Sequence, residues 1–179
     1  MHRRLLLEQL ERYRSVDDAE ADAHRRISEF VRAHSDCFER SLSIGHVTGS
    51  AWLLDESGER ALLTFHKKLG KWLQLGGHAD GDPDPLSVAL REAREESGIA
   101  SISAVSEDIF DLDVHAIPAR GHDAEHFHYD VRFLCQVRGH DAYTVSEESR
   151  QLAWVSKSEL AAWDVDDSVR RMYRKWLAL

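Results

Sequence analysis

Three glutamates with helical spacing are the first candidates for chemistry in this sequence. Glu92, Glu95 and Glu96 stand at positions i, i+3 and i+4, so their carboxylates share one face of a helix. Like charges on one face repel each other, by roughly a few tenths of a kcal/mol per pair. A divalent cation would relieve this repulsion, and oxygen ligands suit Mg²⁺ or Mn²⁺. The alternative interpretation is a solvated acidic face on a surface helix.

The residues around these glutamates predict where the helix begins and ends. Asp84 suits the N-cap and Pro85 the first helical position. Gly98 suits the left-handed residue that follows the last turn. Apolar residues recur at helical spacing and predict a buried stripe, made of Leu86, Ala89, Leu90 and Ala93.

The whole stretch 76–99, GGHADGDPDPLSVALREAREESGI, resembles the Nudix box, G-x5-E-x7-R-E-U-x-E-E-x-G-U, where U is a bulky aliphatic residue. The positions that match are Gly77, Arg91, Glu92, Glu95, Glu96, Gly98 and Ile99. Two positions depart from the pattern: Pro83 stands where the first glutamate is expected, and Ala93 is small for U. In the family that glutamate helps to orient the arginine and the metal site, and here Asp82 or Asp84 is the candidate substitute.

The resemblance implies a Nudix-type α/β/α sandwich with a mixed sheet. It also implies a metal-dependent hydrolase that cleaves the diphosphate linkage of a nucleoside diphosphate derivative or a related organic pyrophosphate. The expected cofactor is Mg²⁺, with Mn²⁺ as a substitute, and the expected partner is a small diphosphate substrate. The implied metal ligands are the Gly76 carbonyl and the side chains of Glu92, Glu95 and Glu96. Glu95 would also assist proton transfer, and Arg91 would position the carboxylates.

Family members often supply one more carboxylate from a loop beyond the box. Glu148 lies six residues before Trp154, a spacing that resembles the loop acid of mutator-type members. We therefore predict Glu148 as a catalytic residue, with Glu125 as the competing candidate. A solvated acidic loop is the alternative.

Histidines are frequent, with 11 in the chain, and several gather after residue 114. His126 and His128 are two apart on a predicted strand and share a face. With a nearby carboxylate such as Asp113 they could bind zinc, or they could simply line the polar side of the strand. We favour a role in a substrate pocket, and the predicted substrate-binding residues are His78, Arg120, His126 and His128.

Composition narrows the class of protein. The chain has 179 residues, 42% hydrophobic and 31% charged, as expected for a globular protein with a sizeable core. Its net charge of −9 argues against broad nucleic-acid binding. Cys37 and Cys135 stand in unrelated contexts without metal-ligand spacing, which favours a reducing cytoplasm. We find no membrane span and no signal peptide in the sequence.

The pattern of elements predicts two parts, an N-terminal helical extension over residues 1–42 and a Nudix domain over 43–179. Helices are expected over about 2–14 and 17–34, either packed on the domain or forming a homodimer surface. Strands are expected at 45–55, 60–67, 72–75, 109–115, 126–137 and 152–155, followed by a last helix that ends at Leu177.

Two rival functions remain open. A diphosphate isomerase shares this fold but needs a catalytic cysteine, and neither Cys37 nor Cys135 is well placed for that role. A non-catalytic module that senses nucleotides is the second rival, and Pro83 is the feature that favours it.

Overall fold

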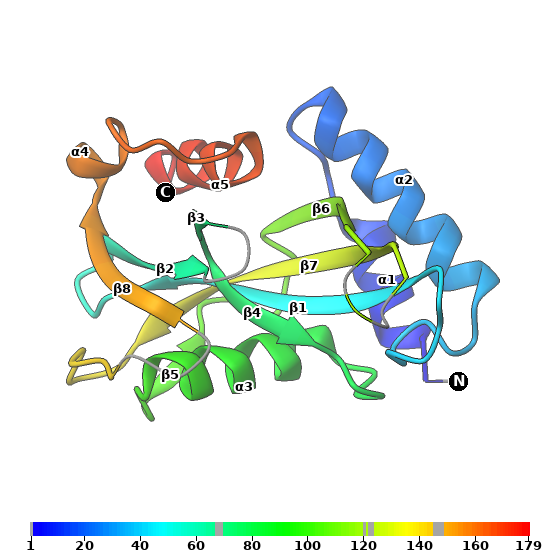
Figure 1. Cartoon of the computed structure of the whole chain (residues 1–179). Coiled ribbons are helices and arrows are strands. Elements are labelled where there is room, and N and C mark those ends of the chain that lie inside the picture. The colour runs from blue at the N-terminus through cyan, green and yellow to red at the C-terminus, as the bar shows by residue number, and fades with distance from the viewer. Residues whose placement is uncertain (1, 67–69, 120, 122–123, 145–148) are drawn as a thin grey trace.

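The computed structural model describes residues 2–66, 70–119, 121, 124–144 and 149–179 of the chain (Figure 1). Its centre is a mixed sheet with the strand order β3-β2-β1-β7-β5, in which β4 pairs with β1, β6 with β7, and β8 with β2. The strands are β1 (Gly45–Leu54), β2 (Arg60–His66), β3 (Lys71–Leu73), β4 (Leu75–His78), β5 (Ile102–Ala104), β6 (Asp111–Ile117), β7 (His126–Val137) and β8 (Ser149–Ser156). The pairing of β1 with β7 is parallel, and the other pairings are antiparallel.

The two long central strands separate two hydrophobic clusters. Alternate residues of a strand point to opposite faces, and all ten residues of β1 are buried. Val47 and Ala51 of β1 lie in one cluster with Val131 of β7, whereas Trp52 and Leu134 lie in the other. The strand predicted for residues 126–137 is observed as β7, and its alternate residues contribute to different clusters.

Helices cover both faces of the sheet. Helix α3 (Pro85–Ser97) contributes to the first cluster together with α1 (Arg4–Arg12) and α2 (Asp18–Ala33). On the opposite face, the second cluster contains residues of α4 (Lys157–Leu160) and α5 (Asp167–Leu177). In Figure 1, α3 lies below the sheet and α5 above it. The predicted α/β/α sandwich with N-terminal helices is confirmed.

The N-terminal helices are packed into the main core. Leu6, Leu10 and Ile27 are fully buried, and the Phe30 ring stacks on Tyr129 of β7 at 3.8 Å between centroids. Burial of this kind stabilises by roughly 1.5–3 kcal/mol per large apolar side chain. These contacts support the packed interpretation of the extension. Its treatment as a separate part, residues 1–42, and the homodimer both stay predictions.

One predicted strand is divided in two. Residues 72–75 were expected to form a single strand, but β3 pairs with β2 while β4 pairs with β1. The change of pairing falls at Gln74, whose side-chain amide donates to Asp130. This switch brings the segment Gly76-Gly77-His78 onto the central strand.

None of the described helices is both long and apolar enough to cross a membrane.

Candidate functional site

Helix α3 begins and ends where its sequence predicts. The Asp84 side chain accepts a hydrogen bond from the Leu86 amide at 3.1 Å, and Pro85 occupies the first turn. Gly98 follows the last turn with φ of 71°, a left-handed conformation that glycine adopts without strain. These local signals fix the bounds of the helix that carries the glutamates.

The backbone of β4 passes close to this glutamate face. A Cβ atom added at Gly77 would lie 2.5 Å from Oε2 of Glu92, and one added at Gly76 would lie 2.2 Å from Oγ of Ser50. Any side chain at either position would therefore collide with its neighbours. The glycine pair is required because α3 and β1 both approach the β4 backbone this closely.

Two of the three glutamates face β4, and the third faces solvent. The Gly76 amide donates to Oε1 of Glu96 over a long 3.5 Å, while Glu92 is largely buried beside Gly77. Arg91 forms an ion pair with Glu92 at 3.1 Å and donates to the carbonyl of His78 at 2.8 Å. Glu95 is exposed. Carboxylate oxygens beside a backbone turn form a donor set that suits Mg²⁺ or Mn²⁺.

The loop at Pro83 is held by hydrogen bonds of the two neighbouring aspartates. Pro83 is exposed. Asp82 accepts a hydrogen bond from the Asp84 amide at 3.0 Å, and Asp84 caps α3. Both aspartates therefore stabilise the turn and the helix start. Their substitution for the family glutamate stays a prediction.

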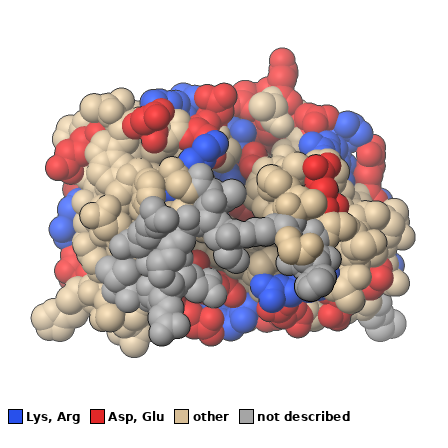
Figure 2. All heavy atoms as spheres, in the orientation of Figure 1, with Lys and Arg blue, Asp and Glu red and all other residues tan. Residues whose placement is uncertain are grey.

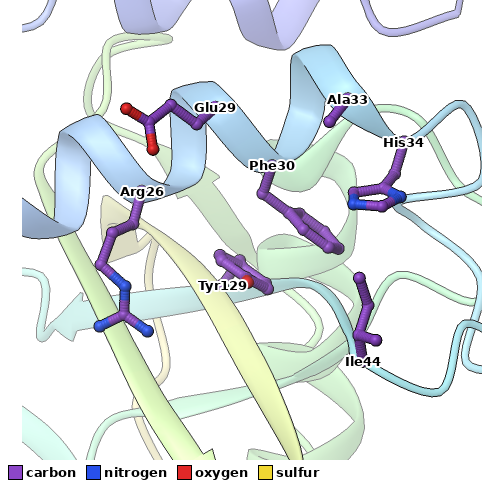
Figure 3. A pocket seen from close by; sticks show the side chains of 7 residues that line it. All are labelled: Arg26, Glu29, Phe30, Ala33, His34, Ile44 and Tyr129. Carbon is purple, nitrogen blue, oxygen red and sulfur yellow. The ribbon is translucent and has the colours of Figure 1, made fainter.

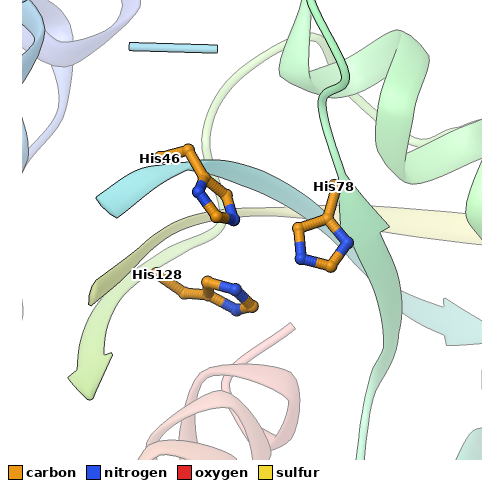
Figure 4. A group of neighbouring side chains, drawn as sticks. All are labelled: His46, His78 and His128. Carbon is orange, nitrogen blue, oxygen red and sulfur yellow. The ribbon is translucent and has the colours of Figure 1, made fainter. Parts of the chain in front are cut away.

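A histidine cluster surrounds the end of β4 (Figure 4). His46 of β1 pairs in register with His128 of β7, and His78 of β4 pairs with Thr48, two residues from His46. The ring centroids of His46, His78 and His128 lie 4.9–5.0 Å apart. The His126 ring lies 5.1 Å from that of His46.

The structure thus brings together three histidines predicted for the substrate pocket, namely His78, His126 and His128, and adds His46. Sequence reasoning missed His46 because it was assigned only to a strand. Its alternation with Thr48 and Ser50 marks a polar face of β1 and is the signal that could have found it.

Burial keeps these imidazoles neutral. Burial, with the charges of His126 and Arg40, lowers the pKa of His46 to about 4. Burial and the charge of Arg40 lower the pKa of His78 to about 4, and burial lowers that of His128 to about 2. Arg40 also contacts Nδ1 of His78 directly. At neutral pH the rings of His46, His78 and His128 are therefore uncharged.

Other predicted residues lie apart from this cluster or beyond the described residues. Arg120 and Glu148 are outside the part of the chain that the structure describes. Glu125 is exposed immediately before β7. The neighbouring His126 contacts the Ala124 carbonyl through Nδ1 at 2.8 Å.

A buried ionic network continues along the same sheet face. Asp113 and Asp111 of β6 pair with Asp130 and Arg132 of β7, next to the pair of His115 with His128. The network includes Glu20 of α2, Asp111 and Asp113 of β6, Asp130 and Arg132 of β7, and Arg171 and Lys175 of α5.

Asp111 is the centre of this network and is fully buried. It accepts from Arg132 at 3.0 Å, from Arg171 at 2.8 Å and from Lys175 at 2.8 Å. Burial alone would raise its pKa, but the hydrogen bond from Arg171 and the charge of Arg132 outweigh burial and hold the pKa below its usual value. Charged partners therefore compensate the cost of burying this carboxylate.

The family model of the NUDIX domain matches residues 46–176, well over half of the chain, and this range contains α3 with its glutamates. The chain belongs to the Nudix family. Members of this family are pyrophosphohydrolases that act on phosphoric anhydrides. A search of curated protein sequences found no significant match.

Solved structures agree on the fold of this Nudix domain. An Ap4A hydrolase of C. elegans aligns with a TM-score of 0.58 and 19% identity, over 74% of this chain and 95% of that chain. A NUDIX-family hydrolase of Clostridium perfringens aligns with a TM-score of 0.53 and 22% identity, over 74% and 97%. A UDP-X diphosphatase aligns with a TM-score of 0.53 and 10% identity, over 99% and 93%.

A hollow of the described surface beside α2 is separate from the box residues of the Nudix domain. It has a volume of about 340 Å³ and is lined by Arg26, Glu29, Phe30, Ala33, His34, Ile44 and Tyr129 (Figure 3). None of these residues belongs to the glutamate face or to the histidine cluster.

On the molecular face in Figure 2, acidic and basic side chains are interspersed rather than segregated.

Proposed function

We propose that the chain is a Mg²⁺-dependent pyrophosphohydrolase, with Mn²⁺ as a substitute cofactor, that cleaves the diphosphate linkage of a nucleoside diphosphate derivative or a related organic pyrophosphate. The observation that carries this proposal is the close fit of the Glu92 carboxylate to the Gly77 backbone, with Glu96 beside the Gly76 amide. Membership of the Nudix family supports it.

The residues proposed to hold the cation are Glu92, Glu95 and Glu96, with the carbonyl of Gly76. The fit rests on the oxygen-only donor set and on the cradle that a side chain at Gly77 would fill. When bound, Mg²⁺ would neutralise the diphosphate and lower the pKa of the attacking water.

The chain's own groups have distinct proposed roles. Arg91 holds Glu92 through an ion pair and holds the end of β4 through the His78 carbonyl, so it positions the carboxylate against the strand. Glu95 is exposed to solvent, from which the attacking water would come, so it is the proposed proton acceptor for water attacking phosphorus. The P–O bond of the diphosphate then breaks, and each product keeps one of the two phosphorus atoms.

Substrate recognition is proposed for the histidine side of the site. His78 links the glycine pair to the cluster, and His126 and His128 lie beside it. Neutral imidazoles can donate and accept hydrogen bonds, which suits a sugar, a base or a phosphate oxygen. Arg120 is proposed from the sequence alone to neutralise a phosphate.

The structure gives a physical reason against the isomerase rival. That chemistry requires a reactive thiol, but Cys37 and Cys135 are both buried. Burial raises the pKa of Cys37 to about 11 and that of Cys135 to about 12. A thiol with such a pKa is almost entirely protonated at neutral pH, so it is a poor nucleophile or base.

The testing experiment is a substrate screen with the full chain and excess Mg²⁺. The panel contains nucleoside triphosphates, nucleotide sugars, ADP-ribose and dinucleoside polyphosphates, and ³¹P NMR identifies the products. We expect hydrolysis of at least one compound and its loss on adding chelator. Calorimetric binding of a nucleotide without turnover would contradict an enzyme and favour the sensor.

A second measurement concerns the additional carboxylate, which we propose to be Glu148 from the sequence. Glu148→Gln should lower kcat more than it raises KM and should barely change thermal stability, because the sequence predicts a polar loop there and a loop acid contributes little to folding. Glu147→Gln is the matched control and should be milder. If Glu125→Gln loses most of its turnover while Glu148→Gln keeps it, the additional catalytic carboxylate is Glu125.

A further inference from the structure

The histidine cluster has the composition of a transition-metal site. Its members offer imidazole nitrogens from three different strands, and one ligand nitrogen from each of His46, His78 and His128 lies within 4.8 Å of the others. A tetrahedral zinc site with Zn–N bonds of about 2.0–2.1 Å needs nitrogens about 3.3 Å apart. Small rotations of the rings would close this difference.

Unpartnered nitrogens provide a second, independent observation. His46 is only 4% exposed, and both of its ring nitrogens lack a hydrogen-bond partner among the described residues. Nε2 of His128 is buried and unpartnered within the same described part of the chain. A buried polar nitrogen without a partner costs free energy, and native structures rarely leave it so. One metal ion would bind one nitrogen of His46 together with one nitrogen of His128.

The charge state suits the same ligand. Burial lowers the pKa of His46 and of His128, so these two rings are neutral and each holds a lone pair at neutral pH. Neutral imidazole is the form that binds metals. Nitrogen ligands favour Zn²⁺, Cu²⁺ or Ni²⁺ over Mg²⁺, whereas the glutamates of α3 have the opposite preference.

We propose that His46, His78 and His128 form a binding site for a transition-metal ion of the Zn²⁺ class, distinct from the carboxylate site on α3. Three protein ligands leave a fourth position open, as in catalytic rather than structural zinc sites. The His126 ring lies 5.1 Å from that of His46 and is the neighbouring candidate for that position. His115, beside His128, contacts Asp113 at 3.1 Å and supplies an outer layer.

Arg40 opposes the binding of a metal ion by His78. Arg40 contacts Nδ1 of His78 and forms an ion pair with Asp80 at 3.2 Å. The guanidinium can only donate, so Nδ1 accepts and the ring proton lies on Nε2. Metal binding through His78 requires this proton to leave or Arg40 to move away. Arg40 therefore competes with the ion, and its removal should strengthen binding.

The site also connects to α3. Arg91 holds the backbone carbonyl of His78, so an ion on the His78 ring would fix the end of β4 beside the glutamates. The proposal does not require the hydrolase activity, and it is tested by metal binding alone.

The test is a zinc titration of the metal-stripped full chain in excess Mg²⁺, by calorimetry and metal analysis. Co²⁺ replaces Zn²⁺ for spectroscopy. We expect one zinc per chain and intense visible Co²⁺ bands typical of tetrahedral nitrogen ligation. His46→Phe should weaken zinc binding by about 10²-fold or more. His140→Phe is the matched control at an exposed loop position and should bind as the wild type does.

Three outcomes would overturn the proposal. The wild type could bind less than one zinc per chain, or His46→Phe could bind zinc as tightly as the wild type. Zinc binding could also be lost in Glu96→Gln, which would place the ion at α3. Circular dichroism checks folding, and His46→Gln repeats the test if His46→Phe is unfolded. Arg40→Gln should bind zinc several-fold more tightly. Unchanged or weaker binding in that variant would count against His78 as the third ligand.

Discussion

Polar side chains are buried at both ends of one face of the sheet, but the two ends differ in how these groups are paired. Along β7, the side chains of His126, His128, Asp130 and Arg132 alternate with core residues and share this face. At the Arg132 end, charges from β6 and α5 meet in paired ionic contacts. At the His128 end, the rings meet one another, and buried nitrogens of His46 and His128 lack partners among the described residues.

The difference teaches which polar cluster needs a ligand. The ionic network satisfies itself, because Asp111 accepts from Arg132, Arg171 and Lys175. It also joins α2 to α5 through Glu20, which contacts Lys175. Such a network has a structural role. The histidine cluster has no internal compensation of this kind, so it is the end of the face where an added ion or substrate group would lower the free energy.

The largest expected effect is a loss of stability when the ionic network around Asp111 is disrupted. Asp111→Asn removes the carboxylate that balances three cations and leaves their charges buried, so we expect a loss of about 3–5 kcal/mol in the free energy of unfolding. Urea denaturation at neutral pH measures it. Glu29→Gln, which breaks the exposed pair with Arg25, is the control and should cost under about 1 kcal/mol. An equally small loss for Asp111→Asn would contradict a structural network.

A smaller effect on stability is expected from a change in pH, and it distinguishes the histidine cluster from the ionic network. The pKa of His46 is about 4 in the folded chain and 6.5 otherwise, so between these values the unfolded chain binds more protons. The charged and titratable groups around it are His78, His126, His128, Arg40 and Asp80. Stability of the metal-free chain should therefore fall as pH is lowered from 6.5 to about 4, by about 3 kcal/mol for His46 alone.

The carboxylate end titrates lower. The pKa of Asp111 is held below 3.8, so its contribution is present above pH 3.8 and is lost only as pH falls further. Denaturation from pH 8 to pH 3 in chelator measures both windows. His78 and His128 also have lowered pKa values, so His46→Phe should remove only the His46 share of the upper window and leave the lower window, while His140→Phe should change neither. A loss of stability across the upper window that is as large in His46→Phe as in the wild type would contradict the assignment.

The smallest effect is expected for His46→Phe at pH 8 without metal. The change keeps the approximate volume and removes two nitrogens that have no partner in the described structure, so we expect stability within about 1 kcal/mol of wild type. Thermal unfolding measures it. A loss as large as that of Asp111→Asn would show that the His46 nitrogens are satisfied in the apo chain, and the contrast between the ends would disappear.

Local signals explain what the sequence could predict. Asp84 and Pro85 mark the start of α3 and Gly98 marks its end, and the period of two in β7 predicts its faces. The glutamate face follows directly, because helical spacing alone places Glu92 and Glu96 together.

Long-range pairing explains what the sequence could not predict. His46 meets His128 and His78 only through the registers of β1 with β7 and β4. The division of residues 72–75 depends on β3 and β4 pairing with different strands. The network around Asp111 joins β6, β7, α2 and α5, and nothing near Asp111 in the sequence indicates that its partners are arginines.

The central claim is that hydrolysis occurs at the glutamate face of α3, and one comparison tests it most directly. The measurement is kcat/KM at subsaturating Mg²⁺ for wild type, Glu96→Gln and the control Glu107→Gln, an exposed loop glutamate. Glu96→Gln keeps the size and removes the charge, so we expect folding to survive and turnover to fall by about 10²-fold or more. Glu107→Gln should match wild type. Unchanged turnover in a folded Glu96→Gln would contradict the claim.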